Sequence, residues 1–259
     1  MLGNFFRSVR SKLPFALRFR PAIIRRFLPF IFGCVFIFCM FSIIKKIGKS
    51  FKSHYVVVDL QEINSLRLYY DEAVPEVVQH PNKLTTVVLL YQQSMKSNTW
   101  ESIGTSEFLR KEGYRVIIIY LPILFSDATP WPTYPLKGAI LAEALRKLNA
   151  VESVLVVPSY TGSYGLPLVV RGGYALKGFV AISPSETDKF TGKEYRILQT
   201  HTLIVYGGND KNFGAGALEN LKMIPNKEIV EVPNAGHFCH IEQMEYFHAI
   251  FLRFLNALK

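Results

Sequence analysis

Three side chains that could together cleave an acyl bond each follow an apolar run of the sequence. Thr161 lies in the turn Pro158-Ser159-Tyr160-Thr161-Gly162 after SVLVV, Asp210 follows TLIVY, and His237 follows EIVEV. An imidazole can take the proton of a hydroxyl that attacks a carbonyl carbon, and a carboxylate can orient that imidazole. We therefore interpret Thr161 as the nucleophile, His237 as the general base and Asp210 as the acid that orients it.

Two serines near Thr161 are alternative nucleophiles. A nucleophile at a sharp strand-to-helix turn, called the elbow below, is the central residue of a G-x-S-x-G pattern. Thr161 matches that central position, whereas Ser159 precedes it by two residues and Ser163 follows it by two. We expect both serines to point elsewhere and to form hydrogen bonds within the turn.

Asp210 and His237 each also have a plainer, structural interpretation. Asp210 alone would suit a turn rich in glycine and asparagine, and a lone His237 is more often structural. His237, Cys239 and His240 have side chains that bind zinc, but no fourth ligand follows at a recognisable spacing. We therefore expect no metal and no cofactor.

Short apolar runs alternate with helical patterns along the chain and would position these residues. Strands are expected at 55–60, 66–70, 85–91, 115–120, 153–157, 178–182, 202–206 and 228–232, and helices at 106–112, 137–149, 218–223 and 242–258. The first two strands should form an antiparallel pair at a sheet edge. The remaining alternation predicts an α/β fold, with a mostly parallel central sheet flanked by helices and chemistry beyond the carboxyl ends of its strands.

Several longer stretches resemble the α/β-hydrolase domain-containing protein 14 family, in particular its membrane-anchored branch. They are SNTWESIG, EGYRVIIIYLP, VLVVPSYTGSYGLPLV, LKGFVAISP, TLIVYGGND and NAGHFCHIE. The resemblance implies an α/β-hydrolase fold and a Ser-Asp-His triad, with Asp210 as the family acid and His237 as its base. It also implies acyl-group removal, including deacetylation, which is associated with the soluble branch.

The chain departs from the family pattern at three places. The family's D-L-P-G loop is Tyr120-Leu121-Pro122-Ile123 here, which should reshape a pocket wall, and the other two departures concern the catalytic groups. Thr161 stands where we align the nucleophilic serine, and its extra methyl group would crowd the attacking oxygen. Tyr91-Gln92 replaces the His-Gly of the loop that stabilises the oxyanion. The N–H groups of Gln93 and Gly162 remain as expected oxyanion-hole donors.

These departures divide the functional interpretation in two. We expect weak or absent acyl ester or amide hydrolysis, with a retained role in binding an acyl-bearing small molecule or a protein partner. The alternative is an active hydrolase or deacylase that uses Thr161, His237 and Asp210.

The charge of the chain is concentrated in its N-terminal part. The formal net charge is +10, and residues 1–54 hold eleven of the thirty Lys and Arg but none of the twenty Asp and Glu. The remainder therefore holds nineteen basic and twenty acidic residues. A nearly neutral domain does not suit a phosphate backbone, so we expect no nucleic-acid partner.

An apolar run of eighteen residues at 27–44 is just long enough to cross a membrane as a helix. We expect a basic cytoplasmic tail at 1–26, a signal-anchor helix at 27–44, a basic linker at 45–54 and the α/β-hydrolase domain at 55–259. Seven basic residues precede the run and four follow it, which predicts a single-pass type II protein with a lumenal or extracellular domain. A mitochondrial transit peptide and a buried core helix are the alternatives.

Overall fold

The computed structural model describes residues 54–75, 85–92, 99–122, 132–171 and 174–258. Their strands form one eight-stranded sheet in the order β1-β2-β4-β3-β5-β6-β7-β8. The strands are β1 (His54–Leu60), β2 (Ile63–Ala73), β3 (Thr86–Gln92), β4 (Arg115–Leu121), β5 (Val154–Pro158), β6 (Gly178–Ile182), β7 (Thr202–Gly207) and β8 (Lys227–Val232). β1 pairs with β2 and β2 with β4 in antiparallel fashion, while β4, β3, β5, β6, β7 and β8 run parallel.

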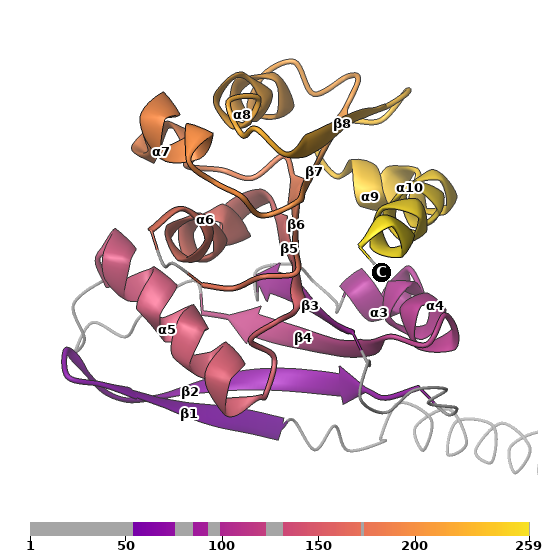
Figure 1. Ribbon diagram of the computed structural model, residues 1–259. Helices are drawn as coiled ribbons and strands as arrows, with labels where there is room; N and C mark the ends of the chain where they lie inside the picture. Colours follow the sequence, from indigo (N-terminus) through magenta and orange to yellow (C-terminus); the bar gives the residue numbers. More distant parts are fainter. Residues whose placement is uncertain (1–53, 76–84, 93–98, 123–131, 172–173, 259) are drawn as a thin grey trace, which may run out of the picture. The chain divides into compact units, whose positions relative to one another are not determined.

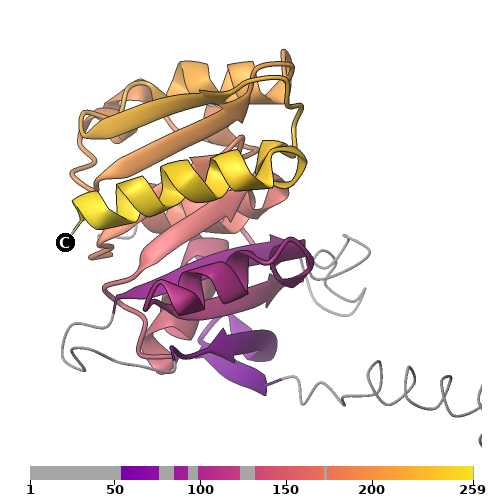
Figure 2. The ribbon, with the colours of Figure 1, turned by 90° about the vertical axis from the view of Figure 1, so that its right-hand side faces the viewer.

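Helices cover both faces of this sheet (Figures 1 and 2). They are α3 (Thr99–Ser102), α4 (Thr105–Lys111), α5 (Tyr134–Lys147), α6 (Gly162–Arg171), α7 (Gly192–Arg196), α8 (Phe213–Leu221), α9 (Cys239–Glu242) and α10 (Met244–Ala257). Two short 3-10 turns, η3 (Ser159–Thr161) and η4 (Thr187–Lys189), follow β5 and β6. Figure 1 shows α5 and α6 on one side of the sheet and α3, α4 and α10 on the other.

The core lies in two apolar layers, one on each face of the sheet. In β5, Leu155 and Val157 belong to the layer under α5 and α6, whereas Val154 and Val156 belong to the layer under α4 and α10. All four are completely buried. Because successive strand residues point to opposite faces, strands buried on both sides need apolar residues throughout, as the sequence of β5 has.

The eight expected strands are confirmed, while some helix bounds differ. The expected C-terminal helix is divided at Gln243, whose φ of −129° and ψ of 57° are not helical. Helix α8 begins at Phe213, five residues before the expected position, and the N–H of this first residue donates to a carboxylate oxygen of Asp210. A hydrogen bond of this kind leaves no trace in apolar periodicity.

The expected tail, signal-anchor and most of the linker lie outside the described residues. Within the part of the chain that the structure describes, none of the helices has the length and apolar character needed to span a bilayer.

Candidate active site

Ser159, His237 and Asp210 form one continuous hydrogen-bonded line. Ser159 Oγ lies 2.8 Å from His237 Nε2, and His237 Nδ1 lies 2.8 Å from Asp210 Oδ2. Ser159 follows β5, His237 follows β8 and Asp210 follows β7. These strands run parallel, so their carboxyl ends lie at the same end of the sheet. The expected contact between Asp210 and His237 is confirmed. The hydroxyl at the end of the line, however, belongs to Ser159.

The structure places Ser159, and not Thr161, at the tip of the elbow. Ser159 directly follows β5 and has a φ of 47°, the strained left-handed conformation expected of an elbow nucleophile. Thr161 is 2% exposed, and its Oγ1 donates a 2.7 Å hydrogen bond to the carbonyl oxygen of Pro158. The interpretation of Thr161 as the elbow tip is therefore wrong, as is the expectation that Ser159 points elsewhere. Ser163 does bond within the turn, to the carbonyl oxygen of Tyr160 at 3.2 Å.

The elbow at Ser159 lacks the flanking glycines of the G-x-S-x-G pattern, and its close contacts are made by other glycines. The glycines that permit close approach lie further along the chain, in α6. A Cβ on Gly162 would lie 2.3 Å from the carbonyl oxygen of Ser185, and one on Gly165 would lie 2.5 Å from Val157. The carbonyl oxygen of Ser159 also accepts the N–H of Ser185 at 2.9 Å. The turn is thus held against the loop that follows β6.

A third glycine, Gly207, allows the loops of Asp210 and His237 to approach each other. A Cβ on Gly207 would lie 2.1 Å from the carbonyl oxygen of Gly236 and 2.4 Å from that of Ala235. The N–H of Asn209 donates to Ala235 at 2.9 Å, and the N–H of Gly236 donates to the Glu242 carboxylate at 2.7 Å. These contacts hold His237 over the loop of its acid.

Asp210 is kept in its charged form by the groups around it. It is 8% exposed. Burial acts to raise the pKa of this carboxyl, but the hydrogen bond with His237 and those from the N–H groups of Gly214 and Phe213 outweigh it, so the pKa lies below its ordinary value. An ionised carboxylate can hold His237 Nδ1 protonated, which leaves Nε2 free to accept the proton of Ser159.

The two expected oxyanion donors have different outcomes. Gln93 lies outside the described residues. The N–H of Gly162 is directed at the carbonyl oxygens of Ser159 and Tyr160 within η3. Its assignment depended on Thr161 as the elbow tip, because an oxyanion hole uses the N–H of the residue after the nucleophile. With Ser159 at the tip, that residue is Tyr160.

The zinc alternative finds no support in the geometry. Among the described residues, no three His, Cys, Asp or Glu side chains are grouped so as to hold a metal ion. Burial raises the pKa of the Cys239 thiol to about 12, so it is not a ready ligand or nucleophile. His240 is 3% exposed, packs on the ring of Trp100, and its Nδ1 has no hydrogen-bond partner.

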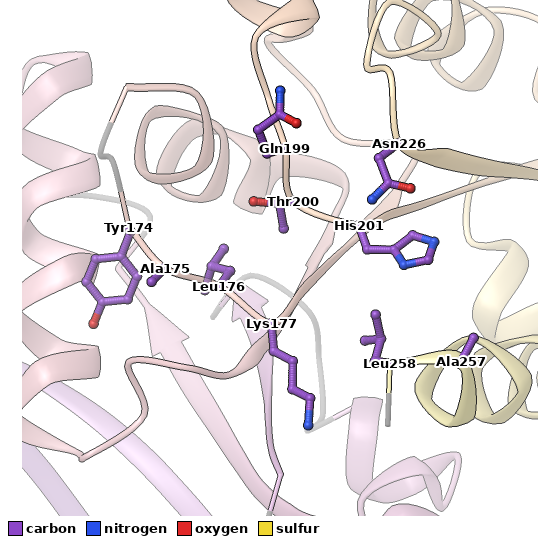
Figure 3. A pocket seen from close by; sticks show the side chains of 10 residues that line it. All are labelled: Tyr174, Ala175, Leu176, Lys177, Gln199, Thr200, His201, Asn226, Ala257 and Leu258. Carbon is purple, nitrogen blue, oxygen red and sulfur yellow. The ribbon is translucent and has the colours of Figure 1, made fainter.

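A shallow pocket of about 560 Å³ lies at the other end of the sheet and is not part of this site (Figure 3). Its lining comes from the segments that lead into β6, β7 and β8, including Lys177, His201 and Asn226, and from the last turn of α10. Ser159, by contrast, follows the carboxyl end of its strand.

The position of Ser159 in the sequence does indicate its role. Ser159 is separated from the run SVLVV by Pro158 alone, so it is the first hydroxyl after the buried strand. Counting from the end of the strand would have selected it. Matching the glycine of a G-x-S-x-G pattern to Gly162 selected Thr161.

Curated proteins that resemble the chain agree on one family, although no protein-family model matches it. The human protein ABHD14A is 37% identical over 194 residues, which are 74% of this chain and 70% of that protein. The human putative protein-lysine deacylase ABHD14B is 34% identical over 202 residues, which are 76% of this chain and 94% of that protein.

Solved structures agree on the fold. A carboxylesterase, CesB from Bacillus subtilis, superposes with a TM-score of 0.64 at 16% identity, over 80% of this chain and 92% of that one. A CIB-like hydrolase from Thermoplasma acidophilum has the same TM-score at 19% identity, over 78% and 97%. At these identities the likeness shows the α/β-hydrolase fold alone. The curated relatives, at 37% and 34% identity over about three quarters of the chain, show that it belongs to the α/β-hydrolase domain-containing protein 14 family.

Proposed function

We propose that the chain hydrolyses acyl esters or amides with Ser159 as nucleophile, His237 as general base and acid, and Asp210 as the residue that orients the imidazole. The observation that carries the proposal is the line from Ser159 Oγ through His237 to Asp210, with both distances at 2.8 Å. This spacing lies within the range that proton transfer between a nucleophile and its base requires.

The chemistry follows from these positions. Ser159 Oγ attacks the carbonyl carbon while its proton passes to His237 Nε2. The tetrahedral intermediate carries its charge on oxygen, where the N–H of Tyr160 and, from outside the described residues, that of Gln93 are our assigned donors. The intermediate collapses as His237 gives the proton to the departing alcohol or amine. Water then attacks the acyl-Ser159 ester while His237 takes one of its protons. His237 gives that proton to the departing Ser159 oxygen, which releases the carboxylic acid and restores the serine.

The main reason to expect weak or absent activity no longer applies. That expectation rested on the methyl group of Thr161 beside the attacking oxygen. The Thr161 hydroxyl instead donates a hydrogen bond to the carbonyl oxygen of Pro158. The second reason remains, because Tyr91-Gln92 replaces His-Gly in the oxyanion loop. If this change turns the Gln93 N–H away from the oxyanion, the loss of that donor would cost about 2.7–4 kcal/mol of transition-state stabilisation and slow hydrolysis.

Labelling by a serine-directed fluorophosphonate probe tests the function directly. We expect the full-length chain to react, and the variants Ser159→Ala and His237→Ala to lose the label. Ser163→Ala is the matched control, since this partly exposed serine lies four residues away and its hydroxyl donates to the carbonyl oxygen of Tyr160 within the turn. Labelling that survives in Ser159→Ala, or a folded wild-type chain that never reacts, would overturn the proposal.

The description of one relative indicates which class of amide substrate to assay first. ABHD14B is described as a putative protein-lysine deacylase, so an acetyl-lysine peptide belongs in the substrate panel beside simple esters. The retained binding role that we expected instead would appear as acyl-compound binding without turnover.

We also propose that residues 27–44 anchor the chain in a membrane, with the basic tail 1–26 in the cytoplasm and residues 55–259 in a lumenal or extracellular space. The uncharged run of eighteen residues and the larger basic cluster before it support this arrangement.

A further inference from the structure

Two exposed phenylalanine rings flank the imidazole of His237. The Phe213 ring centroid lies 5.2 Å from that of His237, and the centroid of Phe238, the next residue along the chain, lies 5.0 Å from it. Phe213 is 59% exposed and Phe238 is 36% exposed. Rings that remain in solvent beside a reactive group often belong to a binding surface, because an apolar ligand releases the water that covers them.

The rings come from different elements, and neither is needed to fill the core. Phe213 is the first residue of α8, and its backbone N–H donates to Asp210 Oδ1 at 3.1 Å. Phe238 directly precedes α9. The contact with Asp210 uses only the backbone of Phe213, so removal of the ring leaves that hydrogen bond in place.

The position of the rings selects one part of a substrate. In the proposed mechanism, His237 Nε2 gives its proton to the leaving oxygen or nitrogen, which must therefore come within hydrogen-bond distance of Nε2. The carbon chain attached to that atom then lies beside the imidazole, where the two rings are. The acyl chain is attached instead to the carbon that Ser159 Oγ attacks.

We propose that Phe213 and Phe238 bind the apolar stem of the leaving group, so that the site prefers esters and amides whose alcohol or amine carries an unbranched alkyl chain or an aromatic ring. This inference rests on the proposed hydrolase function and adds the part of the substrate that sets selectivity.

Two ester series of equal size separate the leaving group from the acyl group. One runs from ethyl to butyl to hexyl acetate, and the other from ethyl acetate to ethyl butanoate and ethyl hexanoate. Unbranched alcohols differ little in acidity, so the first series changes contact area while chemical reactivity stays nearly constant. At about a twofold gain per half-buried methylene, the four added methylenes should raise kcat/KM about sixteenfold from ethyl to hexyl acetate.

The combined variant Phe213→Ala and Phe238→Ala should flatten the alcohol series and leave the slope of the acyl series unchanged. Replacing both rings by leucine should restore part of the alcohol preference. Tyr55→Ala is the control, since Tyr55 is 50% exposed but lies on β1, at the opposite edge of the sheet from β8. Loss of the acyl slope instead, or an unchanged alcohol slope in the folded double variant, would overturn the inference.

Binding measurements keep this test separate from the test of catalysis. In a Ser159→Ala background, which lacks the proposed nucleophile, hexyl acetate should bind about sixteenfold more tightly than ethyl acetate. Removing both rings should abolish that difference. Equal affinities in the presence of the rings would contradict the inference even if the wild type is an active hydrolase. A ring-dependent difference would support it even if the fluorophosphonate result refutes the hydrolase proposal.

Discussion

At the residue scale, the hydroxyl of Thr161 supports the turn that presents Ser159. Thr161 Oγ1 donates to the carbonyl oxygen of Pro158, the residue immediately before Ser159, and both the donor and its surroundings are buried. Leaving the buried carbonyl of Pro158 without its donor should lower the free energy of unfolding. The hydrogen bond from Thr161 takes no part in proton transfer between Ser159 and His237. Stability and reactivity should therefore separate at this position.

Thr161→Val should lower the free energy of unfolding by about 1–3 kcal/mol, because it keeps the side-chain shape and removes the hydrogen bond. Fluorophosphonate labelling of the folded variant should persist. Urea unfolding and labelling measure the two effects, and Thr161→Ser, which keeps the hydroxyl, is the control. A stable Thr161→Val variant that no longer labels would return the nucleophile to Thr161.

His240 should make the fold sensitive to mild acid. Burial, with a smaller effect from neighbouring His237, lowers the pKa of His240 to about 3. Between that value and its unfolded pKa of about 6.5, the unfolded chain binds a proton that the native chain does not. The free energy of unfolding therefore falls as pH is lowered through this window, by roughly 2 kcal/mol from about pH 6.5 to about pH 5.

Urea unfolding at several pH values measures this slope. His240→Phe should reduce it, because phenylalanine can pack against Trp100 and Phe247 without a titrating nitrogen. Curves of wild type and variant that stay parallel across the window would show that His240 does not carry the effect.

At the element scale, the site depends on how closely the loops after β7 and β8 approach each other. Gly207 ends β7, and the carbonyl oxygens of Ala235 and Gly236 occupy the space where its Cβ would be. The same two loops carry Asp210 and His237. Any side chain at position 207 must therefore separate the acid from the base that it orients.

Gly207→Ala should destabilise the fold by about 1–3 kcal/mol and reduce ester hydrolysis or probe labelling at least tenfold. Gly216→Ala is the matched control, since no atom lies within 4 Å of its added Cβ. It lies inside α8, where alanine should stabilise the helix by up to about 1 kcal/mol. Thermal unfolding and labelling measure both variants. Full activity in Gly207→Ala would mean that the loops can separate without disturbing His237.

At the scale of the whole molecule, the distribution of charge separates a basic N-terminal part from a nearly neutral remainder. If residues 27–44 span a membrane as proposed, the chain should resist carbonate extraction, and added protease should spare residues 55–259 in sealed microsomes. Detergent should remove that protection. Digestion of the domain without detergent would reverse the topology, whereas import into mitochondria with loss of the N-terminal part would favour a transit peptide.

The sequence by itself determined the strands and the acid-base pair. Strands such as β5 and β7 are buried on both faces, so unbroken apolar runs marked them, and Asp210 could be located because it follows β7. His237 could be located because it follows EIVEV, a half-exposed strand whose isoleucine and valines still marked it. These features depend on local sequence order, which is why they were readable without coordinates.

Only the tertiary structure decided which hydroxyl meets His237. Ser159, Thr161 and Ser163 lie within five residues, and their direction depends on the backbone rotation at the turn. That rotation depends on packing around the turn, including the approach of Ser185, from the loop after β6, to Gly162 and of Val157 to Gly165. A spacing pattern contains none of those contacts, so the contact of Ser159 with His237, and the approach of the Phe213 ring to the same imidazole, appeared only once the chain was folded.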